Sequence, residues 1–160
     1  METRQACPEC GASWQEGQTC QDHFYQMLAW EHENQGNWAV HHLTVLCYHL
    51  QHPSLYSPEG LRGAIRLLDD FVGRGLTPEQ VRKRDRAAVN SHERTWKIKG
   101  TPDSHGVYDR PVNWTMTAAN VIENGESTYC DSVRAWARSM HEALKARKFS
   151  LRDSRYERNT

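Results

Sequence analysis

The apolar residues in much of the chain recur every three or four positions, which is the spacing of one face of an α-helix. The first segment with this pattern follows residue 20 and has its apolar positions at Phe24, Met27 and Leu28. The residues NQGN at positions 34–37 interrupt the pattern, which resumes over residues 38–52. The sequence therefore predicts two consecutive helices joined by a short break, an arrangement that favours antiparallel packing.

Proline and glycine mark the ends of further helices. Pro53 ends the second helix, because the residue before a proline is pushed out of the α region. Ser57 is the N-cap and Pro58 the first position of a third helix, which ends at the glycines close to residue 75. Thr77 and Pro78 repeat this start signal and therefore predict a fourth helix.

The last third of the chain is predicted to contain a loop, a short helical turn and a long helix. Glycine and proline interrupt every pattern between residues 92 and 113, and residues 117–125 predict the helical turn. The long helix runs from about Ser127 to Ala146. Its apolar stripe consists of Tyr129, Val133, Trp136, Ala137, Met140 and Leu144. Residues 147–160 have no apolar face and are predicted to form a mobile basic tail.

We therefore expect an all-α fold, a compact helical domain of about five helices over residues 1–146. The length of 160 residues suits one such domain. No apolar run approaches the roughly 20 residues that a membrane span needs. The N-terminal residues METRQACPEC are polar rather than a signal peptide, so the expectation is a cytoplasmic protein without a membrane segment.

The formal net charge is zero, but the charges are unevenly distributed. Residues 1–70 contain 3 Lys or Arg and 9 Asp or Glu, a net charge of −6, and residues 71–160 contain 17 and 11, a net charge of +6. Such an asymmetry can mark a bipolar surface or a chain that associates as a homodimer. It does not mark a strong nucleic-acid binder.

Three of the five cysteines lie within the first 20 residues, in the stretch CPECGASWQEGQTC. In a reducing compartment this crowding favours metal binding over disulfides. Cys7 and Cys10 form a Cys-x-x-Cys pair followed by glycine, and Cys20 can supply a third thiolate from the first turn of a helix. Zinc takes four such ligands in a tetrahedron, so residues 7–20 predict a zinc knuckle. A redox pair would be expected beside a βαβ pattern, which the sequence lacks.

The identity of the fourth ligand is open between two histidines. His23 is one helical turn from Cys20 and completes a C-x-x-C … C-x-x-H arrangement. His52 is the alternative, because antiparallel packing of the first two helices brings the end of the second helix to Cys20. His49 would approach the same place less directly. Cys47 and Cys130, by contrast, are expected to be buried thiols that bind no metal.

The motifs CPECGA, LAWE, HHLTVLCYHLQHPS and YCDSVRAWARSMHEA resemble an uncharacterised family of bacterial proteins of unknown function. Its pattern has an N-terminal C-x-x-C-G, a further cysteine and a helix reading H-x-L-x-V-x-x-Y-x-x-Q-H-P, which here starts at His41. The resemblance covers most of the chain in scattered blocks. It implies His52 as the fourth ligand, because the pattern does not require a histidine at position 23. The pattern often has an acidic residue where this chain has Leu46, which counts against catalysis on that helix face.

A second candidate site lies on the helix of residues 38–52. Glu31 should approach His41 across the helix pair, and His41 shares one face with Tyr48 and His52. A carboxylate that orients a histidine is how a general base is built. A pocket around Glu31, His41 and Tyr48, with His92 or His105 added, would therefore suit an enzyme. A hydrogen bond that merely fixes helix packing is the alternative.

Basic residues offer two further candidate surfaces. Residues 82–99 contain 7 Lys or Arg against Asp85 and Glu93, a net charge of +5, and the same stretch contains Trp96. Such a stretch can bind nucleic acid, but it is more often a solvated helix face, and the sequence pI of about 7.1 also disfavours nucleic acid. Arg134 and Arg138 are one helical turn apart and could hold an anion, or they could pack beside Trp136.

These observations favour a cytoplasmic helical protein with a structural zinc that acts by binding a protein partner or a small ligand. The proposed zinc ligands are Cys7, Cys10, Cys20 and His52. One alternative is a Glu/His-based or metal-dependent, hydrolase-like enzyme. Another is a catalytic zinc with three cysteine ligands and water in the fourth position.

Overall fold

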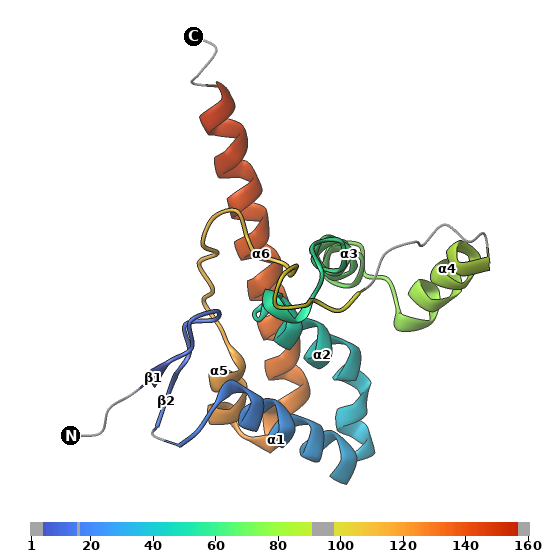
Figure 1. Ribbon diagram of the computed structural model, residues 1–160. Coiled ribbons are helices and arrows are strands. Elements are labelled where there is room, and N and C mark those ends of the chain that lie inside the picture. The colour runs from blue at the N-terminus through green and yellow to red at the C-terminus, as the bar shows by residue number, and fades with distance from the viewer. Residues whose placement is uncertain (1–4, 16, 91–97, 157–160) are drawn as a thin grey trace.

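The computed structural model describes residues 5–15, 17–90 and 98–156, with side chains left undescribed at 5, 87–90 and 148–156. Two short strands precede six α-helices in this part of the chain (Figure 1). The strands are β1 (Gln5–Ala6) and β2 (Ser13–Trp14), which pair antiparallel. The α-helices are α1 (Cys20–Glu33), α2 (His41–Leu50), α3 (Pro58–Leu68), α4 (Pro78–Asn90), α5 (Ala118–Asn124) and α6 (Tyr129–Tyr156). The predicted all-α class is confirmed.

Short segments of other helix types connect several of these elements. Three are 3₁₀ turns, at Gln35–Val40, Pro53–Leu55 and Glu126–Thr128. The fourth is a π-helical turn at Asp69–Gly73, which continues α3. The helix that was predicted to begin at Trp38 begins as an α-helix only at His41, because residues 35–40 form a 3₁₀ turn. The β1–β2 ribbon was not predicted.

Helix α6 forms the centre of the fold, and α2, α5 and the turns Gln35–Val40 and Asp69–Gly73 pack against it (Figure 1). Helix α1 packs on α5 and α2, and α3 packs on α2. The side chain of Trp136 is fully buried on α6, and Met27 of α1, Leu50 of α2 and Leu68 of α3 are buried with it in one core. Helix α6 continues past Ala146, where we predicted its end, to Tyr156. The division of the chain at residue 146 and the mobility of the tail remain predictions.

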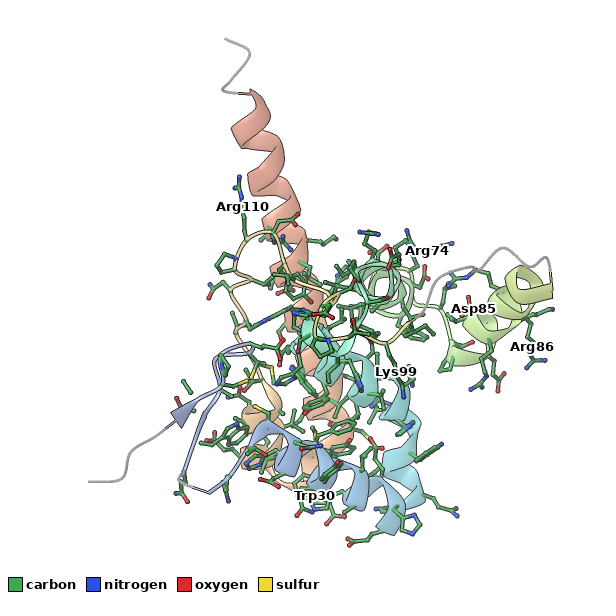
Figure 2. All side chains as sticks on the ribbon, viewed as in Figure 1. Trp30, Arg74, Asp85, Arg86, Lys99 and Arg110 are labelled. Atoms are coloured by element: carbon green, nitrogen blue, oxygen red, sulfur yellow. The ribbon has the colours of Figure 1, made fainter. Side chains whose placement is uncertain are left out.

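Side-chain caps fix where the helices begin. Thr19 and Asp22 form a capping box at the start of α1, with the Thr19 hydroxyl accepting from the Asp22 N–H. Ser57 caps α3 by accepting from the Gly60 N–H at 2.9 Å, as its sequence predicts. Thr77 accepts from the Gln80 N–H at the start of α4. Helix α4 projects from the body, and the Asp85 and Arg86 side chains labelled on it in Figure 2 are exposed.

The loop that leads to α5 is tied to the end of α2 by side-chain hydrogen bonds. Gln51 donates from Nε2 to the Met116 carbonyl oxygen at 2.7 Å, and the Tyr108 hydroxyl donates to the Leu50 carbonyl oxygen at 2.5 Å. The carbonyls at the end of a helix have no partner within the helix, so such a donor is stabilising. Among the described residues, no helix has both the length and the apolarity needed to cross a membrane.

Tyr108→Phe removes the donor to the Leu50 carbonyl but keeps the ring. We expect the free energy of unfolding to fall by about 1 kcal/mol, the typical net value of such a hydrogen bond. Urea denaturation measures the change. Tyr25→Phe is the matched control, because Tyr25 is 55% exposed and its hydroxyl accepts from the exposed Gln21 amide. An equal loss in both variants would contradict the prediction.

Candidate metal centre

The N-terminal ribbon forms a tight turn that presents two cysteines. Ala6 pairs with Ser13, and inside this pair the Cys7 N–H donates to the Ala12 carbonyl at 2.8 Å. Gly11 has φ = +77°, a conformation that favours glycine, and its N–H donates to the Cys7 carbonyl at 2.9 Å. The turn therefore holds the Cys7 and Cys10 side chains on one side.

The other two candidate ligands come from helix ends. Cys20 is the first residue of α1, directly after its N-cap, where the partial positive charge of the helix favours a thiolate. His52 follows the C-cap of α2 and directly precedes Pro53. Its Nδ1–H donates to the Tyr48 carbonyl oxygen at 2.7 Å, which leaves the Nε2 lone pair for a metal.

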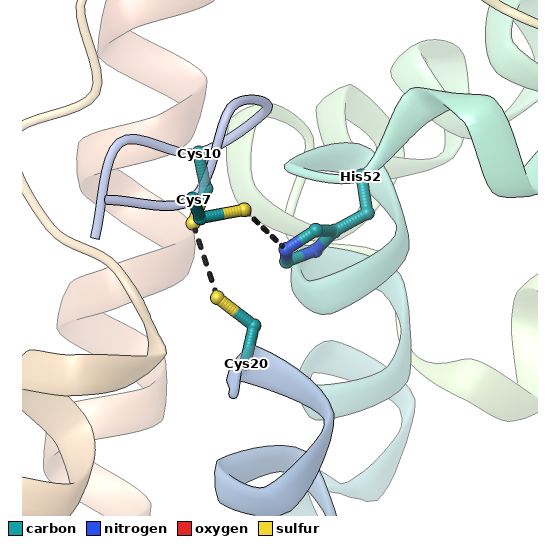
Figure 3. Close-up of side chains that lie close together, drawn as sticks. All are labelled: Cys7, Cys10, Cys20 and His52. Atoms are coloured by element: carbon teal, nitrogen blue, oxygen red, sulfur yellow. Dashed lines mark hydrogen bonds between the residues drawn. The ribbon is translucent and has the colours of Figure 1, made fainter. Parts of the chain in front are cut away.

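The structure brings Cys7, Cys10, Cys20 and His52 together (Figure 3). Their ligand atoms all lie within 4.8 Å of one another, with Cys10 Sγ 3.5 Å from Cys20 Sγ and Cys7 Sγ 3.6 Å from His52 Nε2. A zinc–sulfur bond of about 2.3 Å gives a tetrahedron with an edge of about 3.8 Å. The group therefore has the size and the donor atoms of a site for one tetrahedral metal ion.

Electrostatic interactions within the group favour a thiolate at Cys20 and a protonated imidazole at His52. The hydrogen bond with Cys10 lowers the pKa of Cys20 to about 4, and hydrogen bonds with His52 and Trp14 act in the same direction. That same bond to Cys20, together with burial, raises the pKa of Cys10. Burial opposes the charged form of His52, yet hydrogen bonding to Cys20 raises its pKa to about 9. A bound cation would replace these protons, since metals bind the deprotonated ligands.

The Trp14 indole is a neighbour of the site that sequence reasoning missed. Its Nε1–H donates to Cys20 Sγ at 3.0 Å, and its side chain is buried. The ring stacks on His23, with centroids 3.5 Å apart and an interplanar angle of 11°. His23 itself is buried, and its Nε2 has no hydrogen-bond partner among the described residues. His23 therefore packs against Trp14 and is not one of the four candidate ligands.

The residues of the second candidate site do not all converge. Glu31 and His41 meet as predicted, with Nδ1 of His41 2.6 Å from Oε2 of Glu31. Tyr48 instead stacks on Phe24 with centroids 4.2 Å apart and lies beside His52 at the metal end of α2. His105 donates to the Gly106 carbonyl at 3.1 Å. His92 falls outside the described residues, as does Trp96.

The two remaining cysteines differ in exposure. Cys47 is fully buried, and burial raises the pKa of its thiol, as expected for an inert side chain. Cys130 is only partly buried, contrary to expectation, with Sγ 3.5 Å from the Gly36 carbonyl oxygen. Cys130 is the second residue of α6, and the 3₁₀ turn Gln35–Val40 contacts it on one side.

A family model, described as a family of unknown function (DUF5946), matches residues 5–145. The chain belongs to this family. The match spans the candidate metal centre and all of α1 to α5, and the expected resemblance to a family of unknown function is confirmed. Comparisons with curated proteins and with solved structures gave no significant match. Membership in DUF5946 therefore brings no activity to the site, and its chemistry has to come from the residues.

Trp14→Phe removes the indole donor to Cys20 and keeps an aromatic ring at the site. Loss of a hydrogen bond to a metal ligand typically weakens metal binding 10- to 100-fold, so we expect the affinity for Co²⁺ to fall at least roughly tenfold with one ion still bound. Competition titration followed by the thiolate-to-cobalt absorption band measures it. Trp38→Phe, on a 57% exposed residue outside the group, is the control, and equal affinities of the two variants would refute the prediction.

Proposed function

We propose that Cys7, Cys10, Cys20 and His52 bind one zinc ion that stabilises the fold, and that the protein acts by binding a partner or small ligand. The observation that carries the proposal is the convergence of four donor atoms within 4.8 Å from three separate segments. Three sulfurs and one imidazole nitrogen suit zinc, because soft thiolates select it over magnesium or calcium. A complete set of four protein ligands is typical of structural zinc sites.

The local structure explains why a metal would matter for stability. The β1–β2 ribbon has two residues in each strand, too few to be stable on its own. The cysteines of its turn reach Cys20 at the start of α1 and His52 at the end of α2. Zinc at this position would tie the ribbon to both helices, and the burial of Cys10, Cys20 and His52 would shield the bonds from water.

The binding role is supported by the surface rather than by the metal. A closed coordination sphere leaves no position for a substrate at the zinc. The side chains of Leu55, Ile98 and Val107 are exposed and come from segments joined by backbone hydrogen bonds, such as Gly100 N–H to Leu55 carbonyl at 3.1 Å. We propose a protein or small-molecule partner for this chain rather than nucleic acid, and self-association through its oppositely charged halves.

Self-association predicts a salt-sensitive dimer, because attraction between exposed charges weakens as the Debye length falls from about 10 Å at 0.1 M salt to about 3 Å at 1 M. Light scattering of the zinc-loaded chain should give the mass of a dimer at low salt and of a monomer at 1 M NaCl. A mass that does not change with salt would contradict the role of the charged halves.

The zinc proposal predicts one zinc per chain by mass spectrometry of protein purified without chelator. Cys20→Ser and His52→Ala should lose or weaken zinc binding and lower the melting temperature, because each removes a ligand. Free zinc at about a thousand times its dissociation constant should stabilise the wild type by about 4 kcal/mol relative to the metal-free chain. His23→Ala is the control for a buried histidine outside the group and should keep its zinc.

The same experiment separates a structural zinc from a catalytic one. If His52→Ala retains a full zinc complement and an unchanged melting temperature, His52 is not a ligand. Water would then hold the fourth position, as in a hydrolytic zinc site. If Cys20→Ser also retains its zinc, the metal is not bound by this group, and the proposal is wrong.

A further inference from the structure

Glu31 is a buried carboxylate at the end of α1 farthest from the metal centre, next to Trp30, which is labelled in Figure 2. Its side chain has no exposed surface. A buried carboxylate is costly unless donors surround it. Two donors do so: the Tyr129 hydroxyl donates to Oε1 at 2.5 Å, and His41 donates from Nδ1 to Oε2 at 2.6 Å. Helices α1, α2 and α6 thus contribute one side chain each to a single hydrogen-bonded group.

The Tyr129 side of this group is closed to solvent. Tyr129 is 1% exposed, and its hydroxyl also lies 2.8 Å from the hydroxyl of the fully buried Thr44. Burial raises the pKa of the Tyr129 phenol and the hydrogen bond to Glu31 raises it further, so the phenol stays protonated and donates. The hydrogen bond from Tyr129 therefore fixes the orientation of the Glu31 carboxylate.

The His41 side of the group is open. The His41 side chain is 32% exposed, and one face of its ring stacks on Trp38 at 4.0 Å with an interplanar angle of 9°. Because Nδ1–H is bonded to Glu31, the lone pair is on Nε2. Within the described residues Nε2 has no hydrogen-bond partner, and this atom reaches solvent.

Two arginines act electrostatically on His42, the residue after His41. His42 packs edge-on against Phe71 with centroids 4.8 Å apart. Burial lowers the pKa of His42 most, and the positive charges of Arg134 and Arg82 lower it further. Arg134 pairs with Asp131 at 3.7 Å, in a contact that is largely exposed to water and therefore weak. This surface would attract a negatively charged molecule.

We propose that His41, positioned by Glu31 and Tyr129, is the general base of a second site that hydrolyses small esters carrying a negative charge. His41 Nε2 takes a proton from a water molecule while the water oxygen bonds to the ester carbonyl carbon. The tetrahedral adduct then expels the alcohol oxygen, which takes the proton back from Nε2. The products are a carboxylic acid and an alcohol. The step needs neither a metal nor a redox partner, and the inference is independent of the zinc proposal.

The test uses the full-length, zinc-loaded chain and two chromogenic probes, mono-4-nitrophenyl glutarate, which is anionic, and 4-nitrophenyl acetate, which is neutral. His41→Ala should lower the second-order rate constant about 100-fold, the lower range of general-base catalysis. Tyr129→Phe keeps the ring but removes the donor to Glu31 and should cost about tenfold. His32→Gln is the matched control, because His32 is exposed on the last turn of α1, and it should react like the wild type.

Two readouts separate catalysis from a packing role. Free imidazole should restore the activity of His41→Ala, whereas a packing role would lower its melting temperature without such rescue. The wild type should prefer the anionic probe, and Arg134→Gln should remove that preference. The proposal is overturned if His41→Ala matches the wild type, or if His32→Gln loses as much activity.

If His41→Ala does not fold, the wild type itself still provides the test. Diethyl pyrocarbonate modifies imidazole nitrogens, and mass spectrometry identifies which histidines carry the label. We expect His41 to be labelled fastest and esterase activity to fall in proportion to its labelling. Full labelling of His41 with unchanged activity would overturn the proposal.

Discussion

The antiparallel packing of α1 against α2 is the constraint on which both candidate sites depend. The short 3₁₀ turn Gln35–Val40 reverses the chain, so the start of α1 meets the end of α2. At that end Cys20 comes close to His52, and at the other end Glu31 contacts His41. Each pair joins a residue of α1 to one on or just after α2, and neither would form if the two helices diverged. The core side chains that hold the helices together, such as Met27 and Leu50, are therefore also what positions the chemistry.

In both candidate sites a buried aromatic side chain donates a hydrogen bond to the group that carries the negative charge. In each, a sulfur or oxygen acceptor receives a hydrogen bond from the polar atom of a buried aromatic ring in another segment: Trp14 for Cys20, and Tyr129 for Glu31. A large aromatic side chain can fill space in the core and still offer one directed donor. Removing such a donor leaves an acceptor in low dielectric, where an unsatisfied charge is expensive. The aromatic residue thus contributes both packing and orientation.

The sequence was sufficient for features that depend on helical period and chain reversal. It predicted the helix pair, the approach of His52 to the cysteines and the contact between Glu31 and His41. It could not reveal Trp14 or Tyr129 as donors, because each depends on how separate segments pack. The end of α6 was misplaced because an apolar stripe marks where a helix is buried, not where it stops. Residues after Ala146, such as Lys148 and Leu151, are themselves good helix formers. Tyr48 shares a helix face with His41, but face alone does not fix where a side chain packs, and its ring turns to Phe24.

The position of the two sites along α2 also determines how they can influence each other. His41 and His52 are eleven residues apart, which corresponds to roughly 16 Å along a helix at 1.5 Å per residue. A ligand at His41 therefore cannot touch the metal centre, and a zinc ion cannot take part in proton transfer at Nε2. Any coupling has to pass through the position of α2 itself, since α1 and α6 both pack against it. Loss of a metal bound by the candidate ligands would loosen the α1–α2 end near His52 first, and it would reach the Glu31–His41 hydrogen bond only if the whole helix pair shifted.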